Sequence, residues 1–199
     1  MTGKYRFSDY KIHKVKRIII HEGYRVLPSE DGPLKAVHDI ALVELTESIK
    51  FDDTQNSVPL FGENEEIPVG AVGEFVGWGR TETDIYPKVA QRVELPIVSY
   101  EDCNNVPFIV QYKGLMENQF CAGSMDADGQ NLCRGDSGAP LLIDGRVVGI
   151  ASWGGDEGCE VKESPSVFTE VSKYRSWIDK IINEKTVSIS NEIINAISN

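Results

Sequence analysis

Short apolar segments separated by turn-forming residues run along most of this chain. They are rich in Val, Ile and Phe, and Gly, Pro, Asp or Asn stands between many of them. Seven such segments are Arg17 to His21, Ile40 to Leu45, Glu74 to Val76, Gln91 to Val98, Ala139 to Ile143, Val147 to Trp153 and Ser166 to Val171. Short strands at this spacing predict an antiparallel β-sandwich or β-barrel.

One segment departs from that pattern. Apolar residues recur at helical spacing in YRSWIDKIINEK, namely Tyr174, Trp177, Ile178, Ile181 and Ile182. This periodicity predicts an amphipathic helix packed on the β-structure. The mostly polar residues that follow, Thr186 to Asn199, either extend this helix or form a second one.

The charge balance excludes several classes of function. Twenty Lys and Arg residues stand against 31 Asp and Glu, which leaves a net charge of −11. Nucleic acid is therefore not expected as the main partner, because phosphate binding needs clustered cations. The one basic run, Lys11 to Arg17, is interpreted as a solvated strand face. No apolar run is long enough to span a bilayer, and the opening MTGKYRFSDYK has no secretory signal.

The four cysteines are widely spaced and form no CxxC pair. They are Cys103, Cys121, Cys133 and Cys159. Four cysteines allow three pairings, and their even number and spacing fit two disulfides formed in an oxidising compartment. Four buried thiols in a cytosolic protein remain the alternative on composition alone. No metal site is readable, since the acidic stretches do not match a calcium-loop spacing, and no cofactor is expected.

The segment NLCRGDSGAPLL, at residues 131–142, places a serine between glycines. Gly135 and Gly138 allow backbone dihedral angles that other residues avoid. The N–H groups of Gly135 and Ser137 can then point at a developing oxyanion, where preorganised donors are worth roughly 3 to 4 kcal/mol of barrier. Ser137 is a candidate nucleophile, although a serine needs a base to take its proton.

Several further motifs accompany this loop in an order typical of one family. They are HDIALVEL at residues 38–45, VGWGRT at 76–81, FCAG at 120–123, CRGDSGAPLL at 133–142, IASWG at 150–154 and VFTEVSKYRSWI at 167–178. The chain resembles a chymotrypsin-like serine protease of the trypsin superfamily. The resemblance implies an all-β fold, a double antiparallel β-barrel with the first barrel incomplete, plus a C-terminal helix.

The resemblance also implies a division of the chain. Residues 1–66 are expected to be a remnant of the N-terminal barrel, 67–170 the C-terminal barrel, 171–185 the C-terminal helix, and 186–199 a tail of unknown structure. The implied disulfides join Cys103 to Cys121 and Cys133 to Cys159. Protein or peptide substrates and protease inhibitors are the implied partners, and a secreted monomer is expected, with no nucleic acid or membrane as partner.

Catalytic roles follow from the same resemblance. Asp39 matches the aspartate of the catalytic triad and Ser137 its nucleophile, while Gly135 and Ser137 supply the oxyanion hole. Family members carry the histidine base before the aspartate, in an Ala-Ala-His-Cys motif. This motif is not found around any of the three histidines of the chain, which are His13, His21 and His38.

None of these histidines is expected to be the base. His38 directly precedes Asp39, and adjacent residues on a strand point to opposite faces, so His38 should face away from the site. The family's free activation terminus, which pairs with the equivalent of Asp136, is not recognisable either. We therefore expect that the early first-barrel strands lie upstream of Met1, that Asp136 is an unpaired buried carboxylate, and that this chain does not hydrolyse peptides.

The resemblance assigns a substrate pocket as well. The implied substrate-binding residues are Asn131, Arg134, Ser152, Trp153, Gly154 and Ser166. Asn131 at the pocket base offers no charge to substrate Lys or Arg, which argues against trypsin-like cleavage. Gly154 leaves the entrance open, whereas Ser166 narrows the facing wall. The expected preference is chymotrypsin-like, for aromatic or large apolar residues, or elastase-like if Ser166 intrudes.

Two hypotheses about function remain. The first is a serine endopeptidase of chymotrypsin type, inactive as this chain because the base is absent. The second is a non-catalytic homologue that acts as a binding or regulatory module. The residues at catalytic positions favour the first hypothesis, and the missing histidine favours the second.

Overall fold

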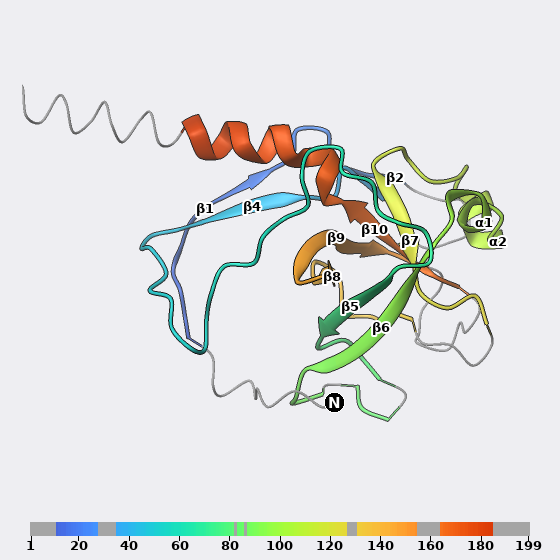
Figure 1. The fold of residues 1–199 in the computed structure, drawn as a ribbon, viewed down its shortest axis with the longest axis horizontal. Coiled ribbons are helices and arrows are strands. Elements are labelled where there is room, and N and C mark those ends of the chain that lie inside the picture. The colour runs from blue at the N-terminus through green and yellow to red at the C-terminus, as the bar shows by residue number, and fades with distance from the viewer. Residues whose placement is uncertain are drawn as a thin grey trace, which may run out of the picture.

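A computed structural model describes residues 11–27, 35–81, 83–85, 87–126, 131–154 and 164–184 of the chain. It shows a mostly β fold with a C-terminal helix (Figure 1), which confirms the expected fold class. The tail at 186–199, whose structure the sequence left open, lies outside the described residues.

Six antiparallel strands close into a barrel in the order β10-β7-β6-β5-β8-β9 (Figure 1). These strands are β5 (Val72–Gly77), β6 (Gln91–Val98), β7 (Gln119–Ala122), β8 (Pro140–Ile143), β9 (Arg146–Trp153) and β10 (Ser166–Glu170). Along β5, Gly73, Phe75 and Gly77 are buried while the residues between them are more exposed. Successive strand residues point to opposite faces, so the alternating pattern puts one set of side chains inside the barrel.

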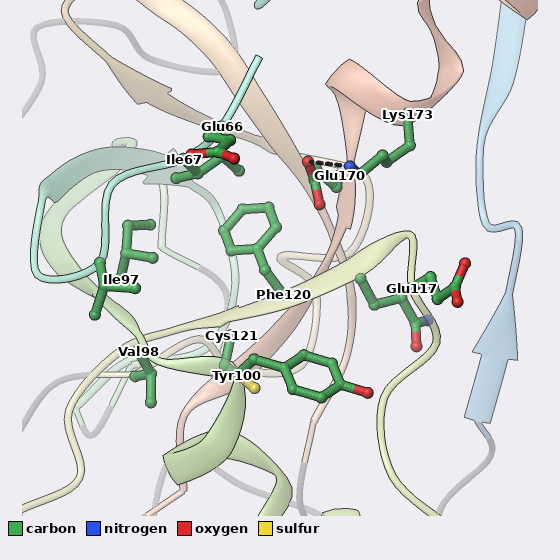
Figure 2. A pocket seen from close by; sticks show the side chains of 12 residues that line it. Glu66, Ile67, Ile97, Val98, Tyr100, Glu117, Phe120, Cys121, Glu170 and Lys173 are labelled. Atoms are coloured by element: carbon green, nitrogen blue, oxygen red, sulfur yellow. Dashed lines mark ion pairs between the residues drawn. The ribbon is translucent and has the colours of Figure 1, made fainter. Parts of the chain in front are cut away.

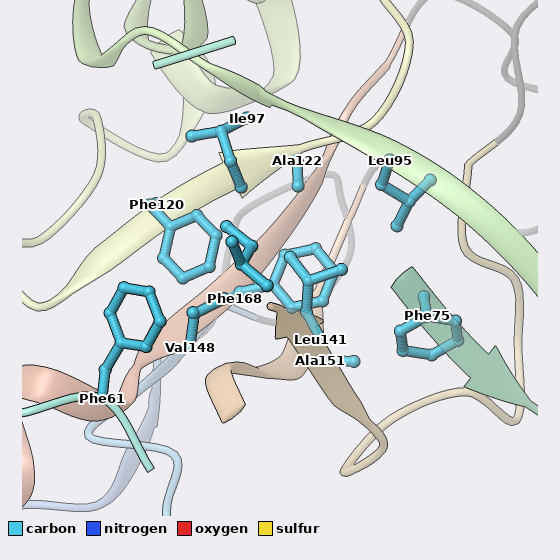
Figure 3. Close-up of a cluster of buried hydrophobic side chains, with 11 residues drawn as sticks. Phe61, Phe75, Leu95, Ile97, Phe120, Ala122, Leu141, Val148, Ala151 and Phe168 are labelled. Carbon is cyan, nitrogen blue, oxygen red and sulfur yellow. The ribbon is translucent and has the colours of Figure 1, made fainter. Parts of the chain in front are cut away.

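The barrel encloses a cluster of aromatic and aliphatic side chains (Figure 3). Its buried members are Phe61, Phe75, Leu95, Ile97, Phe120, Ala122, Leu141, Ile143, Val148, Ala151 and Phe168. Phe120 and Phe168 stack with ring centroids 5.4 Å apart. Gly149 lies against this stack, because a Cβ atom there would come within 2.6 Å of Phe120 Cζ. Only glycine permits so close an approach of backbone and ring.

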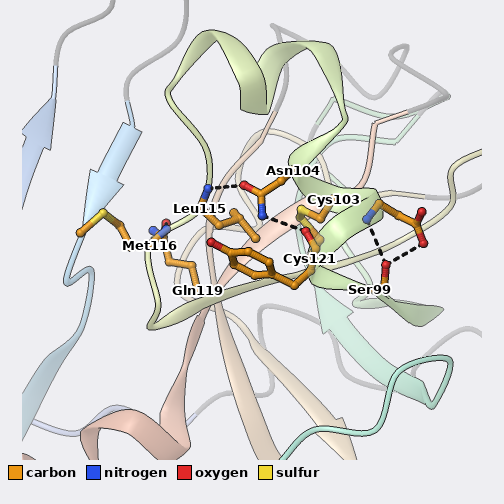
Figure 4. The surroundings of a disulfide bond; sticks show 9 residues. Ser99, Cys103, Asn104, Leu115, Met116, Gln119 and Cys121 are labelled. Carbon is orange, nitrogen blue, oxygen red and sulfur yellow. Dashed lines mark hydrogen bonds between the residues drawn. A yellow bond between two sulfur atoms is a disulfide. The ribbon is translucent and has the colours of Figure 1, made fainter.

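Two short helices lie between β6 and β7. They are α1 (Tyr100–Asn104) and α2 (Pro107–Gln111). Ser99 caps α1, since its Oγ accepts a hydrogen bond from the N–H of Asp102 at 3.0 Å. A disulfide joins Cys103 in α1 to Cys121 in β7 (Figure 4), which is the pairing that the family resemblance implies. The helix is thereby tied covalently to the barrel wall.

The chain ends its described part in a 3₁₀-helix at Val171–Tyr174 and an α-helix at residues 175–184. Of the apolar residues predicted from their helical spacing, Trp177 packs beside this junction, whereas Ile182 is exposed. Tyr174 and Ile178 are buried in a cluster with Ile40 and Val171. The C-terminal helix therefore packs on the barrel and also on the segment of the chain that precedes the barrel.

That preceding segment, β1 to β4, is here called the N-terminal unit. It contains two separate two-stranded sheets, one of β1 (Val15–Ile20) with β4 (Ala41–Leu45) and one of β2 (Arg25–Leu27) with β3 (Lys35–Val37). The β1–β4 sheet leaves Ile18, Ile20 and Val43 more than half exposed. Within the described residues, the chain thus closes one barrel and leaves the strands of the N-terminal unit open.

Candidate active site

Ser137 lies on an exposed loop before β8. Its neighbours Gly135 and Gly138 have φ angles of 102° and 84°, which lie in the region that favours glycine. The loop buries Asp136 and turns Ser137 to solvent. Among the described residues, Ser137 Oγ has no hydrogen-bond partner, and the N–H groups of Gly135 and Ser137 donate to none. A free hydroxyl and two free N–H donors therefore occur within three residues.

The Asp136 carboxylate is held by the backbone beneath the loop. Oδ1 accepts from the N–H of Gly79 at 2.8 Å, and Oδ2 accepts from the N–H of Cys133 at 3.0 Å. The sequence analysis expected an unpaired carboxylate. The residue is buried as expected and has no ion pair in the described part of the chain, but two N–H donors satisfy it.

Glycines of the VGWGRT motif make room for this carboxylate. A Cβ atom on Gly77 would lie 2.0 Å from Asp136 Oδ1, and one on Gly79 would lie 2.3 Å from Oδ2. Neither approach is physically possible, so both positions require glycine. The motif at residues 76–81 and the serine loop are therefore two parts of one structural unit.

Burial raises the pKa of Asp136 above its ordinary value, and the two N–H donors partly offset that effect. Desolvation disfavours the charged form of a carboxyl group, whereas hydrogen bonds to that form favour it. A hollow of about 310 Å³ adjoins the carboxylate and is lined in part by Gly79, Cys133 and Asn131. A cationic group that entered this hollow would meet a buried acid.

Asp39 lies between β3 and β4 and reaches the barrel. Ser152 Oγ in β9 donates to Asp39 Oδ2 at 2.7 Å, and Thr169 Oγ1 in β10 donates to the Asp39 main-chain carbonyl at 2.9 Å. The sequence analysis treated His38 and Asp39 as adjacent residues on a strand, which was wrong, because β4 begins only at Ala41. His38 has a φ of 48°, and that turn frees Asp39 from the strand so that it can approach β9.

The three histidines all belong to the described part of the chain, and none is bonded to Ser137. His13 Nε2 lies 3.2 Å from Gln55 Oε1. His21 Nδ1 accepts from the N–H of Gly23 at 3.0 Å. His38 Nδ1 lies 3.0 Å from the Tyr174 hydroxyl. His38 does turn away from the Ser152 contact, but its backbone turn, rather than strand alternation, is the cause.

The predicted pocket residues lie around the serine loop. The side-chain amide of Asn131 is hydrogen-bonded to the backbone of Ser124. Its Oδ1 accepts from the Ser124 N–H at 2.9 Å, and its Nδ2 donates to the Ser124 carbonyl at 3.2 Å. Ser166 Oγ accepts from the N–H of Leu132 at 3.2 Å. A Cβ atom on Gly154 would come no closer than 3.9 Å to that Oγ. Gly154 and Ser166 thus face each other at a distance at which a Cβ atom on Gly154 would just touch the Ser166 hydroxyl.

The remaining predicted residues are placed as follows. Trp153 is buried at the end of β9 against Phe108 and Tyr112 of the α2 region. Arg134 is exposed on the serine loop, and its carbonyl accepts from the N–H of Arg80 at 2.9 Å. Cys133 is disulfide-bonded, and Cys159, its implied partner, lies outside the described residues.

A second hollow, of about 290 Å³, lies on another side of the barrel (Figure 2). Phe120, Ile97 and Ile67 form apolar parts of its wall, and an ion pair between Glu170 and Lys173 stands at its edge. None of the predicted catalytic or substrate-binding residues lines it. No group of three or more metal-ligating side chains occurs in the described ranges, and no helix among them could span a membrane.

Comparison with known proteins gives one consistent result. The family model described as "Trypsin" matches residues 2–178. The chain is 34% identical over 171 residues to a trypsin of Phaedon cochleariae, which covers 85% of this chain and 62% of that protein. It is 36% identical to phenoloxidase-activating factor 1 of Holotrichia diomphalia, over 75% of this chain and 41% of that protein. The chain spans about half the length of these curated relatives.

A solved structure agrees with these sequence matches. Neuropsin, described as a serine protease expressed in the limbic system of mouse brain, superposes with a TM-score of 0.70. The two sequences are 31% identical, and the match covers 85% of this chain and 71% of that one.

Proposed function

Because this chain belongs to the trypsin family of serine proteases, we propose that Ser137 is the nucleophile of a peptide-bond hydrolase. Asp39 is its triad aspartate, and the N–H groups of Gly135 and Ser137 form the oxyanion hole. Protein and peptide chains are the substrate class, and the two-barrel arrangement expected from the sequence, with a boundary near residue 66, is retained as part of the proposal.

The single observation that carries this proposal is the pair of contacts at Asp39. Ser152 and Thr169 bind this residue from two strands of the closed barrel, and the same barrel carries the serine loop. A carboxylate fixed beside the nucleophile's own barrel can orient and stabilise a base placed between the two.

The proposed chemistry balances only if a base is supplied. Ser137 Oγ would attack the carbonyl carbon and give its proton to the base, and the leaving amine would take that proton before water cleaves the acyl-enzyme. His13, His21 and His38 are all engaged elsewhere. We therefore propose that these 199 residues alone do not turn over peptides, since a triad enzyme without its base loses roughly six orders of magnitude in kcat.

The proposed specificity is for aromatic or large apolar residues. Asn131 carries no charge, and both ends of its amide are occupied by Ser124, so substrate Lys or Arg would find no counter-ion there. Gly154 carries no side chain that would close the entrance to an apolar residue, while Ser166 Oγ, within contact distance of a Cβ atom at Gly154, limits the size of that residue. The edge of β9 at Ser152 to Gly154 would bind the substrate backbone as an added strand.

The alternative, a non-catalytic module that binds peptides through the same pocket, is supported by the missing base. In either case we propose that the protein acts outside the cell, because its disulfide chemistry requires an oxidising compartment. The Cys103–Cys121 bond supports this location.

The test combines turnover with binding. The purified chain, its Ser137→Ala variant and a peptide-free blank are assayed with amide substrates that end in Phe, Leu or Lys. Binding of the matching product peptides is measured by calorimetry. We expect turnover equal to that of the variant, and binding of the Phe peptide at least tenfold tighter than that of the Lys peptide. Turnover above the variant would overturn the inactivity, and preferred Lys binding would overturn the specificity.

A further inference from the structure

Two of the histidines that the catalytic site does not use lie against each other. The rings of His21 and His38 are parallel within 7°, with centroids 5.0 Å apart. Tyr174 meets both rings edge-on, and Trp177 packs on His21 at 5.0 Å. The pair is therefore part of the contact between the N-terminal unit and the C-terminal helix.

His38 is held in a backbone conformation that residues with a Cβ atom seldom adopt. Its φ of 48° lies in the left-handed region, which costs energy for such a residue, although Asn, Asp and His adopt it more often than the others. The ring is held on one side, because His21 stacks on it and Gly23 lies so close that a Cβ atom there would come within 2.8 Å of His38 Cδ2. Asp39 follows directly in the chain, so the turn at His38 determines the position of the Asp39 backbone.

Both rings use Nδ1 as an acceptor. The N–H of Gly23 donates to His21 Nδ1 at 3.0 Å. The Asn118 amide nitrogen lies 3.0 Å from His38 Nδ1 and donates to the Tyr174 hydroxyl, which itself lies 3.0 Å from the same Nδ1. Backbone and amide nitrogens donate and do not accept, so in this arrangement Nδ1 is the acceptor in both rings, which is the tautomer with the proton on Nε2.

We infer that neutral His38 is a positioning residue for Asp39, and that protonation of the stacked His21–His38 pair releases Asp39 from Ser152. A proton on either Nδ1 opposes an N–H donor that already points at it. Protons on both rings place two cations face to face. The turn at His38 then loses the contacts that offset its strain. The backbone position from which the Asp39 side chain reaches Ser152 is no longer fixed. This inference rests on the proposed role of Asp39.

The charged surroundings of the pair do not cancel this effect. Burial, with a contribution from His38, lowers the pKa of His21, and nearby Glu22 partly offsets both. Glu22 is already engaged, since it accepts from Trp177 Nε1 at 3.0 Å. Tyr174 stays protonated, because burial raises its pKa to about 12.

Among the described residues, the other charged groups near the pair are Asp39, Arg25, Glu117 and Lys173. Arg25 donates to the Gly23 carbonyl at 3.0 Å, and Glu117 and Lys173 face His38 across a hollow. This hollow of about 760 Å³ is lined by His38, Glu117, Asn118 and Lys173, and Lys180 acts on Glu22 from the C-terminal helix. The hollow gives water access to the His38 ring, so the pair can exchange protons with the solvent.

The sign of the pH dependence follows from His21. Its pKa in the folded chain is below the ordinary value, so the unfolded chain binds the proton more tightly. The contribution of His21 to the stability of the fold is complete above about pH 6.5, which is the ordinary pKa of histidine. It is lost as the pH falls through the lower, folded value. Asp39 should therefore leave Ser152 on the acid side of pH 6.5.

The test follows the Asp39 carboxyl carbon and the Trp177 indole N–H by NMR in the 199-residue chain from pH 7.5 to pH 5. We expect both signals to move together with the His21 and His38 ring signals. Ordinary carboxyl groups titrate near pH 4, below this window. No turnover is measured, so a failure here is distinguishable from a failure of the proposed hydrolase.

Variants separate positioning from general packing. In the variant His38→Asn, the new side chain tolerates the left-handed turn and can hydrogen-bond Tyr174, but it does not titrate. The Asp39 signal of this variant should therefore stay at its pH 7.5 position down to pH 5. His38→Ala should displace that signal at every pH. Tyr174→Phe should reduce the coupled shift, and His13→Asn, remote from the pair, should leave it intact. An Asp39 signal that ignores histidine titration, or the same shift in His38→Asn, would overturn the inference.

Discussion

At the scale of single residues, the serine loop depends on a buried acid whose charge is only partly compensated. Asp136 has two N–H partners and no ion pair in the described residues, and burial raises its pKa. A raised pKa means that the folded chain holds the proton more tightly than the unfolded chain. The contribution of Asp136 to stability is therefore complete below about pH 3.8 and is lost as the pH rises through the folded value.

Replacing Asp136 by Asn should remove this pH dependence. We expect the free energy of unfolding of the unchanged chain to fall, relative to Asp136→Asn, as the pH rises from 4 towards neutral. Urea unfolding at several pH values measures the difference, and Asp126→Asn, which alters an exposed carboxylate, is the matched control. A gap between the two proteins that stays constant with pH would contradict the buried, partly uncompensated acid.

The sequence predicted residues of the site to very different degrees. The serine loop and Asp39 were identified because each lies in a continuous motif. The contacts of His38 with Asn118 and Tyr174 were not predicted, since they join residues 80 and 136 positions apart. No local pattern records such a contact.

At the scale of elements, strand positions were predictable and short elements were not. The segment Gln91 to Val98 coincides with β6, and Val147 to Trp153 begins one residue after β9 does. The three-residue strands β2 and β3 and the five-residue helices α1 and α2 were missed. Three residues are too few to show a strand period of 2.0, and five residues make little more than one helical turn of 3.6.

The barrel wall offers a test of packing within one element. Gly149→Ala in β9 places a methyl group against Phe120 and Phe168, and overpacking of this kind costs about 1–3 kcal/mol. Gly154→Ala, at the end of the same segment, meets only ordinary van der Waals contact and should change stability by about 0.5 kcal/mol or less. Urea unfolding of both variants checks this, and equal losses would contradict the close backbone approach at Gly149.

At the scale of the whole molecule, the two halves of the fold differ in how they treat apolar surface. The barrel closes and buries its core, whereas the β1–β4 sheet of the N-terminal unit exposes the cross-strand pair Ile18 and Val43 at 61% and 54%. Open strand edges with exposed apolar side chains favour pairing with another chain. The family resemblance implies a monomer, and this sheet is therefore the part of the described surface most prone to association with another chain.

We predict that the isolated chain self-associates through the β1–β4 sheet as its concentration rises. The double variant Ile18→Lys with Val43→Glu replaces the exposed pair by opposite charges directly across the strands, where they can attract each other. It should shift the sedimentation coefficient towards the monomer at high concentration, by weakening the association at least tenfold. Val110→Glu, which removes an apolar side chain of similar exposure (57%) from α2, should not. Equal association in all three proteins would show that the open sheet is not the contact, because only the double variant changes its surface.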